Sequence, residues 1–241
     1  MAKIVPDLWP LPTTLRDKLG VRAGRQRLLL AEGHAVLVLH HVPRPNEHGR
    51  RPAVFWRLPD GSWRCNPGVD SIETLRAHVE TYAAAIEEID EKLEGAKRAS
   101  EYFAILRVAR PLHRASRNLN TVITSLKEAF PADGEIMALR DRAYDVERQA
   151  ELEVGDAENG LEFLVAQRAE EQTAASLRVA AETHRLNLLA AICLPVTALG
   201  AVLGMNLQNG LEVLPEPVTF WSIVGAAFAF GFYLRHNVQK G

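Results

Sequence analysis

Two long stretches near the C-terminus carry no charged side chain, and they constrain the fold more than any other feature. They run from Leu186 to Met205 and from Val218 to Leu234, in a chain in which 24% of the residues are charged. Helices of about 20 and about 17 apolar-dominated residues can cross a ~30 Å hydrocarbon core, the second near the lower limit. A pair of buried helices in a soluble core is the alternative. Two consecutive uncharged stretches favour a membrane hairpin.

The charges that flank these stretches predict their orientation. Arg185 precedes the first stretch and Arg235 follows the second, whereas the connecting segment 207–217 contains no lysine or arginine. By the positive-inside rule, both termini then lie in the cytoplasm and the connecting segment lies outside. The N-terminal residues contain no apolar run of the signal-peptide type. We expect a multi-pass protein of the bacterial inner (plasma) membrane.

Residues 1–70 predict a small α/β sheet unit. Residues 27–33 and 34–42 are typical of two strands joined by a tight turn, and residues 52–68 of a hairpin around Pro-Asp-Gly. Four short strands cannot form a large core. We therefore expect the sheet to pack against the helices that follow or against another subunit.

From residue 71 onward, apolar residues recur at the three- and four-residue spacing of helices. Asp70 or Ser71 can cap the first of the cytoplasmic helices, which we place at 71–131. The next segment, 132–185, has no proline and can continue as a stalk helix into the first apolar stretch. A helix that long cannot bury its apolar side in one small domain. It predicts parallel copies, as in a coiled coil.

These predictions combine into one architecture. We expect an α+β cytoplasmic domain whose long stalk helix continues into a two-helix transmembrane hairpin, in a symmetric homo-oligomer. The expected segments are 1–70 (sheet unit), 71–131 (cytoplasmic helices), 132–185 (stalk), 186–206 (first span, pore-lining), 207–217 (outer loop), 218–235 (second span) and 236–241 (cytoplasmic tail).

The stretch LPVTALGAVLGMN at 194–206 closely resembles the end of the first transmembrane helix in the CorA family of divalent-cation transporters. That family is marked by Gly-Met-Asn outside this helix, followed by a short loop and a second span. The close resemblance covers roughly residues 186–235 and is architectural elsewhere. It implies a pentameric ion channel or transporter and no enzymatic activity, and the chain contains no catalytic motif that would suggest otherwise.

The resemblance places Gly204, Met205 and Asn206 at the outer mouth of a pore. Mg²⁺ loses its waters reluctantly, so a ring of Asn206 carbonyl oxygens can recognise the hydrated ion. Neutral acceptors also release it, as conduction requires. Gly204 permits close approach at the mouth, and Met205 packs, because a thioether is a poor ligand for a hard cation. The alternative is that Asn206 only caps the helix.

If the first span lines a symmetric pore, one stripe of its residues faces the axis. Stepping inward from the mouth, this stripe includes Ala201, Thr197, Leu194 and Asn187. Thr197 can form a polar ring and Leu194 an apolar gate, while Asn187 is costly to expose to lipid. Thr197 can instead bond its own helix backbone, and Leu194 can simply pack. The register of the family points to Leu186 in place of Asn187.

The sequence departs from the family at three points. Leu203 replaces the usual aromatic before Gly-Met-Asn, the loop differs, and the cytoplasmic part is short, as in short-domain members. Glu212 and Glu216 can attract cations to the mouth or can be solvated loop residues. Asp145 and Asp156 are candidates for a regulatory metal site on the stalk, although a charged run on a helix is usually a solvated face.

We expect Mg²⁺ as the transported or regulatory ion and no other cofactor. Zn²⁺, Co²⁺ or Ni²⁺ is the alternative cargo, because members of the family differ. The expected partners are further copies of this chain, the lipid bilayer and divalent cations. The formal net charge of −2 gives no reason to expect nucleic acid. A non-conducting membrane scaffold or stress-response protein is the alternative from another functional class.

Four histidines in the N-terminal unit raise the question of a zinc site. Adjacent strand positions face opposite sides of a sheet, so two of the four cannot easily share one ion, and we expect no zinc site there. The four are His34, His40, His41 and His48.

Overall fold

The computed structural model describes residues 5–6, 9–19, 24–45, 49–203 and 216–238. Its contacts divide the chain into two compact units, residues 1–166 and residues 167–241. Each unit is described by itself below.

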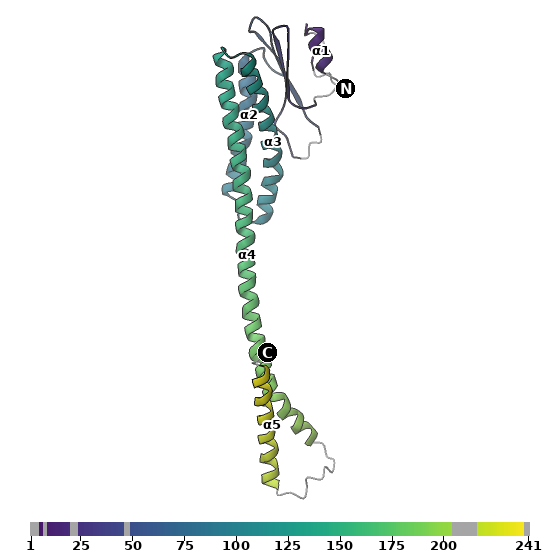
Figure 1. The fold of residues 1–241 in the computed structure, drawn as a ribbon, viewed down its shortest axis with the longest axis vertical. Coiled ribbons are helices and arrows are strands. Elements are labelled where there is room, and N and C mark those ends of the chain that lie inside the picture. Colours follow the sequence, from purple (N-terminus) through teal and green to yellow (C-terminus); the bar gives the residue numbers. More distant parts are fainter. Residues whose placement is uncertain (1–4, 7–8, 20–23, 46–48, 204–215, 239–241) are drawn as a thin grey trace. The chain divides into compact units, whose positions relative to one another are not determined.

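The first unit contains a four-stranded antiparallel sheet in the order β1-β2-β3-β4 (Figure 1). The strands are β1 (Arg27–Ala31), β2 (His34–His40), β3 (Pro52–Arg57) and β4 (Trp63–Asn66). Between β1 and β2, Glu32 and Gly33 both have positive φ, at 53° and 77°, as a two-residue type I′ turn requires. The two predicted hairpins are therefore confirmed.

Both faces of the sheet are buried, each by a different part of the chain. One face packs against the helices that follow the sheet in the chain, with Leu37, Leu39 and Phe55 in the shared core. The opposite face, with Val36 and Trp56, packs against α1 (Thr13–Leu19) and the segment before it. The sequence analysis predicted the first of these layers, but it did not predict α1.

Two helices and the first part of a third lie side by side along the first unit (Figure 1). They are α2 (Ile72–Glu94), α3 (Ala99–Ala129) and α4 (Gly134–Leu203). Ser71 caps α2, because its hydroxyl oxygen accepts the backbone N–H of Glu73 at 3.1 Å. Asp70, the other predicted cap, instead accepts the backbone N–H of Cys65 at 2.9 Å.

The helix α4 is 70 residues long and belongs to both units. As predicted, it continues through the expected stalk and into the first apolar stretch, with Pro195 inside it. In the first unit it buries Ile136, Leu139 and Val146 against the other helices. The second unit adds α5 (Glu216–Val238), which begins two residues before the expected second span.

Candidate functional site

In the second unit, the end of α4 packs directly against α5. Gly231 lies close to α4: a methyl group at its Cα would lie 3.1 Å from the Cα of Ile192 and 3.3 Å from the carbonyl oxygen of Ala191. Further along, Val196 and Leu199 of α4 line a small apolar cavity together with Ile223 of α5. These contacts define the face of α4 that is turned toward α5.

The small residues of α5 do not all serve this contact. Gly231 and Ala227 are buried, whereas Gly225 has no heavy atom within 4 Å of the position that its Cβ would occupy. Ala226 and Ala229 are exposed. The close packing is therefore confined to one part of the small-residue run.

The predicted pore stripe lies on the opposite side of α4. At 3.6 residues per turn, Leu194 and Thr197 are rotated by about half a turn from the face that carries Ile192 and Val196. Leu194 is 64% exposed, and Asn187, Thr197 and Ala201 are also exposed. α5 therefore leaves this stripe uncovered.

The hydroxyl of Thr197 is turned back onto its own helix. Its Oγ1 lies 3.0 Å from the carbonyl oxygens of both Cys193 and Leu194, and its single proton can serve either acceptor. Threonine side chains in helices commonly donate in this way to a backbone carbonyl of the preceding turn. It agrees with the alternative stated from the sequence, and the lone pairs of the oxygen remain available on the exposed side.

Four of the predicted site residues cannot be placed. Gly204, Met205, Asn206 and Glu212 lie outside the described residues. Glu216 is the first residue of α5. The roles proposed for these five residues remain predictions.

Within the described chain, α4 alone contains a helical stretch that is both long and apolar enough to cross a membrane. The mean hydropathy of its most apolar window is 1.7, and none of that window is buried. The apolar stretch of α5, Phe220–Tyr233, is shorter than this criterion requires. The result supports the first predicted span more directly than the second.

The predicted regulatory acids lie on α4 in the first unit. Asp145 and Asp156 are both exposed. Burial, followed by the charges of Asp90 and Asp156, raises the pKa of Glu153, so this part of the unit disfavours further negative charge. Among the described residues, no three His, Cys, Asp or Glu side chains lie together as a metal site would require.

The arginines near these acids form ion pairs with other carboxylates. Arg142 donates to both carboxylate oxygens of Glu80 on α2, at 2.7 and 2.6 Å. Arg148 pairs with Glu151, one turn along the same helix. Arg142 and Arg148 therefore pair with neighbouring acids, and Arg142 does so across to another helix.

The histidines of the first unit make separate contacts. Nδ1 of His34 accepts the indole N–H of Trp56 at 3.1 Å. His41 lies edge-on to His78, with 5.4 Å between ring centroids. His40 is 8% exposed, and His48 lies outside the described residues.

One feature of the first unit was missed by the sequence analysis. A cavity of about 550 Å³ opens between α3 and the segment that joins β2 to β3, and arginines from three parts of the chain line it. The sequence does contain a local group of basic residues, Arg44, Arg50 and Arg51. It does not predict the cavity, because Arg25 and Arg114 also line it and only the fold brings them close.

Similarity to known proteins is found in the structure and not in the sequence. No protein-family model matches the sequence, and a search of the curated proteins found no match. Among solved structures, the cytoplasmic domain of ZntB from Vibrio parahaemolyticus RIMD 2210633 matches with a TM-score of 0.54 and 14% identity, over 67% of this chain and 80% of that one.

A second match extends over nearly the whole chain. The full-length CmaX protein superposes with a TM-score of 0.56 and 14% identity, covering 97% of this chain and 83% of that one. The CorA magnesium transporter from Methanocaldococcus jannaschii matches with a TM-score of 0.47 and 12% identity, over 94% and 86% of the two chains. From the first two matches, this chain has the α+β fold, with a small sheet and a long helix, that is found in the ZntB cytoplasmic domain and in CmaX.

Proposed function

We propose that this protein is a homo-oligomeric membrane channel or transporter for divalent cations, and that its cargo is Mg²⁺. The observation that carries the proposal is the place of Gly-Met-Asn in the chain. The tripeptide directly follows α4, which ends at Leu203 in a stretch without charge. In the CorA family the same motif follows the first transmembrane helix. The fold of CmaX, which matches nearly the whole of this chain, is consistent with this resemblance.

The exposed apolar surface of the second unit supports a membrane location. Leu186, Leu194 and Val202 of α4 are 65%, 64% and 65% exposed, and Trp221 of α5 is 70% exposed. A contiguous apolar surface of this kind is costly in water and is normally covered by lipid or by protein. In the proposed assembly, α5 faces lipid and the stripe of Asn187, Leu194, Thr197 and Ala201 faces the axis.

The proposed recognition of the ion uses neutral oxygen atoms. Mg²⁺ keeps its hydration shell tightly, so Asn206 carbonyls from several copies would accept hydrogen bonds from the bound waters. Leu194 would then form an apolar constriction that gates by dewetting. Glu212 and Glu216 would raise the local cation concentration outside, and Asp145 and Asp156 would respond to cytoplasmic Mg²⁺.

The decisive experiment measures entry of Mg²⁺, Zn²⁺, Co²⁺ and Ni²⁺ into liposomes that contain the purified full-length protein, each ion read with an internal dye that responds to it. Asn206→Ala is compared with Asn209→Ala, which removes an amide from the same loop outside the motif. We expect Mg²⁺ entry with the parent protein and with Asn209→Ala, and its loss with Asn206→Ala while the oligomer stays intact by size-exclusion chromatography.

Each other outcome favours a stated alternative. Entry of Zn²⁺, Co²⁺ or Ni²⁺ without Mg²⁺ would assign the cargo to a transition metal. Equal flux in the parent protein and in Asn206→Ala would remove the motif from ion recognition. No flux of any of these ions through an intact oligomer would favour a non-conducting membrane scaffold.

A further inference from the structure

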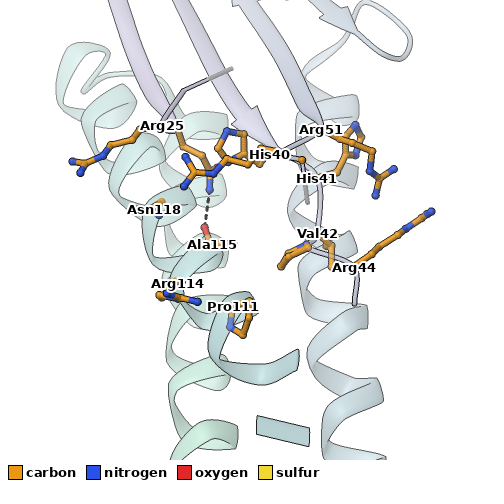
Figure 2. Close-up of a pocket in the computed structure, with 14 residues that line it drawn as sticks. Arg25, His40, His41, Val42, Arg44, Arg51, Pro111, Arg114, Ala115 and Asn118 are labelled. Carbon is orange, nitrogen blue, oxygen red and sulfur yellow. Dashed lines mark hydrogen bonds between the residues drawn. The ribbon is translucent and has the colours of Figure 1, made fainter. Parts of the chain in front are cut away.

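The arginine-lined cavity of the first unit has the size and shape of a small-molecule site. It is about 550 Å³ in volume, within the usual range of 300–1,000 Å³ for ligand pockets. Figure 2 shows Pro111, Arg114 and Asn118 of α3 along one side, and Val42 and Arg44 on the other. The helix α3 and the segment that joins β2 to β3 therefore form its two walls.

The rim of this cavity carries positive charge. Arg25, Arg44, Arg50 and Arg114 are exposed around it, and no aspartate or glutamate occurs among the described residues that line it. In the described part of the chain, Arg25, Arg44 and Arg114 form no ion pair, whereas arginines elsewhere in the unit do. Like charges gathered in this way are unfavourable unless an anion lies between them.

Two polar side chains behind the arginines are buried and are held by the protein itself. Gln26 and His40 are 9% and 8% exposed. Nε2 of Gln26 donates to the carbonyl oxygen of Ala115 at 2.8 Å (Figure 2), and this side chain also interacts with the hydroxyl of Tyr82. His40 interacts with the backbone of Gly24. The arginines around the rim are therefore the charged groups that a ligand can reach.

The lining offers a ligand two kinds of contact. The guanidinium groups can donate hydrogen bonds to anionic oxygens. Val42, Pro111 and Ala115 offer contact to an organic group. Burial, followed by the charge of Arg50, lowers the pKa of His40, so this side chain is disfavoured from adding a further positive charge to the cavity.

We propose that this cavity binds a soluble phosphate ester, such as a nucleotide or a sugar phosphate. The phosphate lies among Arg25, Arg50 and Arg114, and the organic part of the ligand lies against Val42, Pro111 and Ala115. Bidentate contact with phosphate is the geometry for which a guanidinium group is best suited. The site is independent of the proposed ion pathway, since all of its residues belong to the first unit.

The test is isothermal titration calorimetry of the full-length protein in detergent. The probes are magnesium-free ATP, ribose 5-phosphate and inorganic phosphate, at low and at high salt. We expect saturable binding of at least one of the two esters, tighter than that of inorganic phosphate and weakened by salt, because exposed charges are screened. Arg25→Gln and Arg114→Gln should each weaken it about tenfold, the loss expected for one charged hydrogen-bonding group.

The matched control is Arg117→Gln. Arg117 is an exposed arginine of the same helix that does not line the cavity and pairs with Glu147 at 4.0 Å. Its variant should bind like the parent protein. Absence of saturable binding of both esters at millimolar concentration, equal affinity in all three variants, or inorganic phosphate bound as tightly as the esters would overturn the proposal. So would competition in which phosphatidylglycerol in the micelle binds and neither ester does.

Discussion

The two units of this chain differ in how far their large apolar side chains are buried. In the first unit the large side chains of Trp56, Tyr82 and Leu119 are at most 1% exposed. In the second unit Leu194 and Trp221 are 64% and 70% exposed. The first unit therefore forms a hydrophobic core within one chain, although Phe163 at its end is 70% exposed. The second unit forms no such core among its described residues and requires lipid, further copies of the chain, or both.

The helix α4 shows the same contrast along a single element. In the first unit it buries Ile136, Leu139, Ala143 and Val146, one residue every three or four. Among its described residues from 167 to 202, none is buried. Helical structure thus continues where the burial of α4 side chains within the chain ends, which is unusual for a soluble protein because packing normally supplies most of the stability of a helix.

The largest effect that we expect separates the two units by a leucine truncation in each. Leu119→Ala should lower the free energy of unfolding of the first unit by about 2–5 kcal/mol, because it leaves a cavity in a close-packed core. Leu177→Ala, at a side chain that is 67% exposed, should change it by less than about 0.5 kcal/mol. The measurement is denaturant unfolding of the full-length protein in detergent, followed by tryptophan fluorescence.

The contrast between the two units would be wrong if Leu177→Ala were as destabilising as Leu119→Ala. That result would mean that another copy of the chain buries Leu177, and that the stalk stabilises the oligomer as strongly as the core stabilises the first unit.

A second prediction uses acid to act on the first unit through His78. Burial, followed by the charge of His41, lowers the pKa of His78 to about 4 from its ordinary value of 6.5. The folded state therefore binds fewer protons than the unfolded state between these two values, and its stability falls as pH is lowered through this range. The expected loss reaches about 3 kcal/mol, with a contribution of the same sign from His40.

The matched variant is His78→Phe, which keeps a ring against Phe55 and Tyr82. Unfolding curves measured between pH 7 and pH 4 should be flatter for this variant than for the parent protein. An identical dependence on pH in both proteins would show that the acid sensitivity originates elsewhere.

Much of the fold of the first unit could be predicted because local sequence decides it. The turn between β1 and β2, the Ser71 cap and the uninterrupted α4 each follow from a few neighbouring residues. The short helix α1 could not be predicted in this way. Its seven residues are too few for a periodic pattern, and burial of Leu15 and Leu19 against the far face of the sheet stabilises it.

For the candidate sites, too, local sequence predicts some features, whereas others depend on tertiary packing. Helical periodicity correctly groups Leu194, Thr197 and Ala201 on one stripe. It could not tell that α5 contacts the opposite face, because that depends on the close approach at Gly231. Likewise, a basic run in the sequence cannot reveal a cavity whose walls come from segments as distant as Arg25 and Arg114.

A third prediction asks whether the second unit has any close packing of its own. A side chain at Gly231 would meet the backbone of Ile192 at 3.1 Å, and a backbone cannot move aside as a side chain can. Gly231→Leu should therefore separate the two helices and destabilise the second unit by about 1–3 kcal/mol. Thermal unfolding in detergent, followed by circular dichroism, measures the effect.

The control is Gly225→Leu on the same helix, where no atom lies within 4 Å of the new Cβ. This substitution should be neutral or slightly stabilising, since leucine favours helix more than glycine does. Equal losses from both substitutions would show that the exposed side of α5 is also packed, by a neighbouring copy.

The smallest effect that we expect is at the beginning of α4, where the packed part of this helix is joined to the sheet. Oδ1 of Asp133 accepts the backbone N–H groups of Glu135 and Ile136, at 3.2 and 3.3 Å. Its Oδ2 pairs with Arg57 at 3.1 Å, and the guanidinium of Arg57 lies over the ring of Phe130, 4.1 Å from its centroid.

Asp133→Ala removes the cap and the ion pair together, and should cost about 1–2 kcal/mol. Asp133→Asn keeps an oxygen for the cap and should retain most of that stability, because a partly exposed ion pair contributes little. Both losses should appear in fluorescence-detected unfolding of the first unit and leave the Gly231 contact of the second unit unchanged. If Asp133→Asn were as damaging as Asp133→Ala, the charge of Asp133 and its pairing with Arg57 would matter more than the cap, and electrostatic attachment to β3 would hold the first turn of α4.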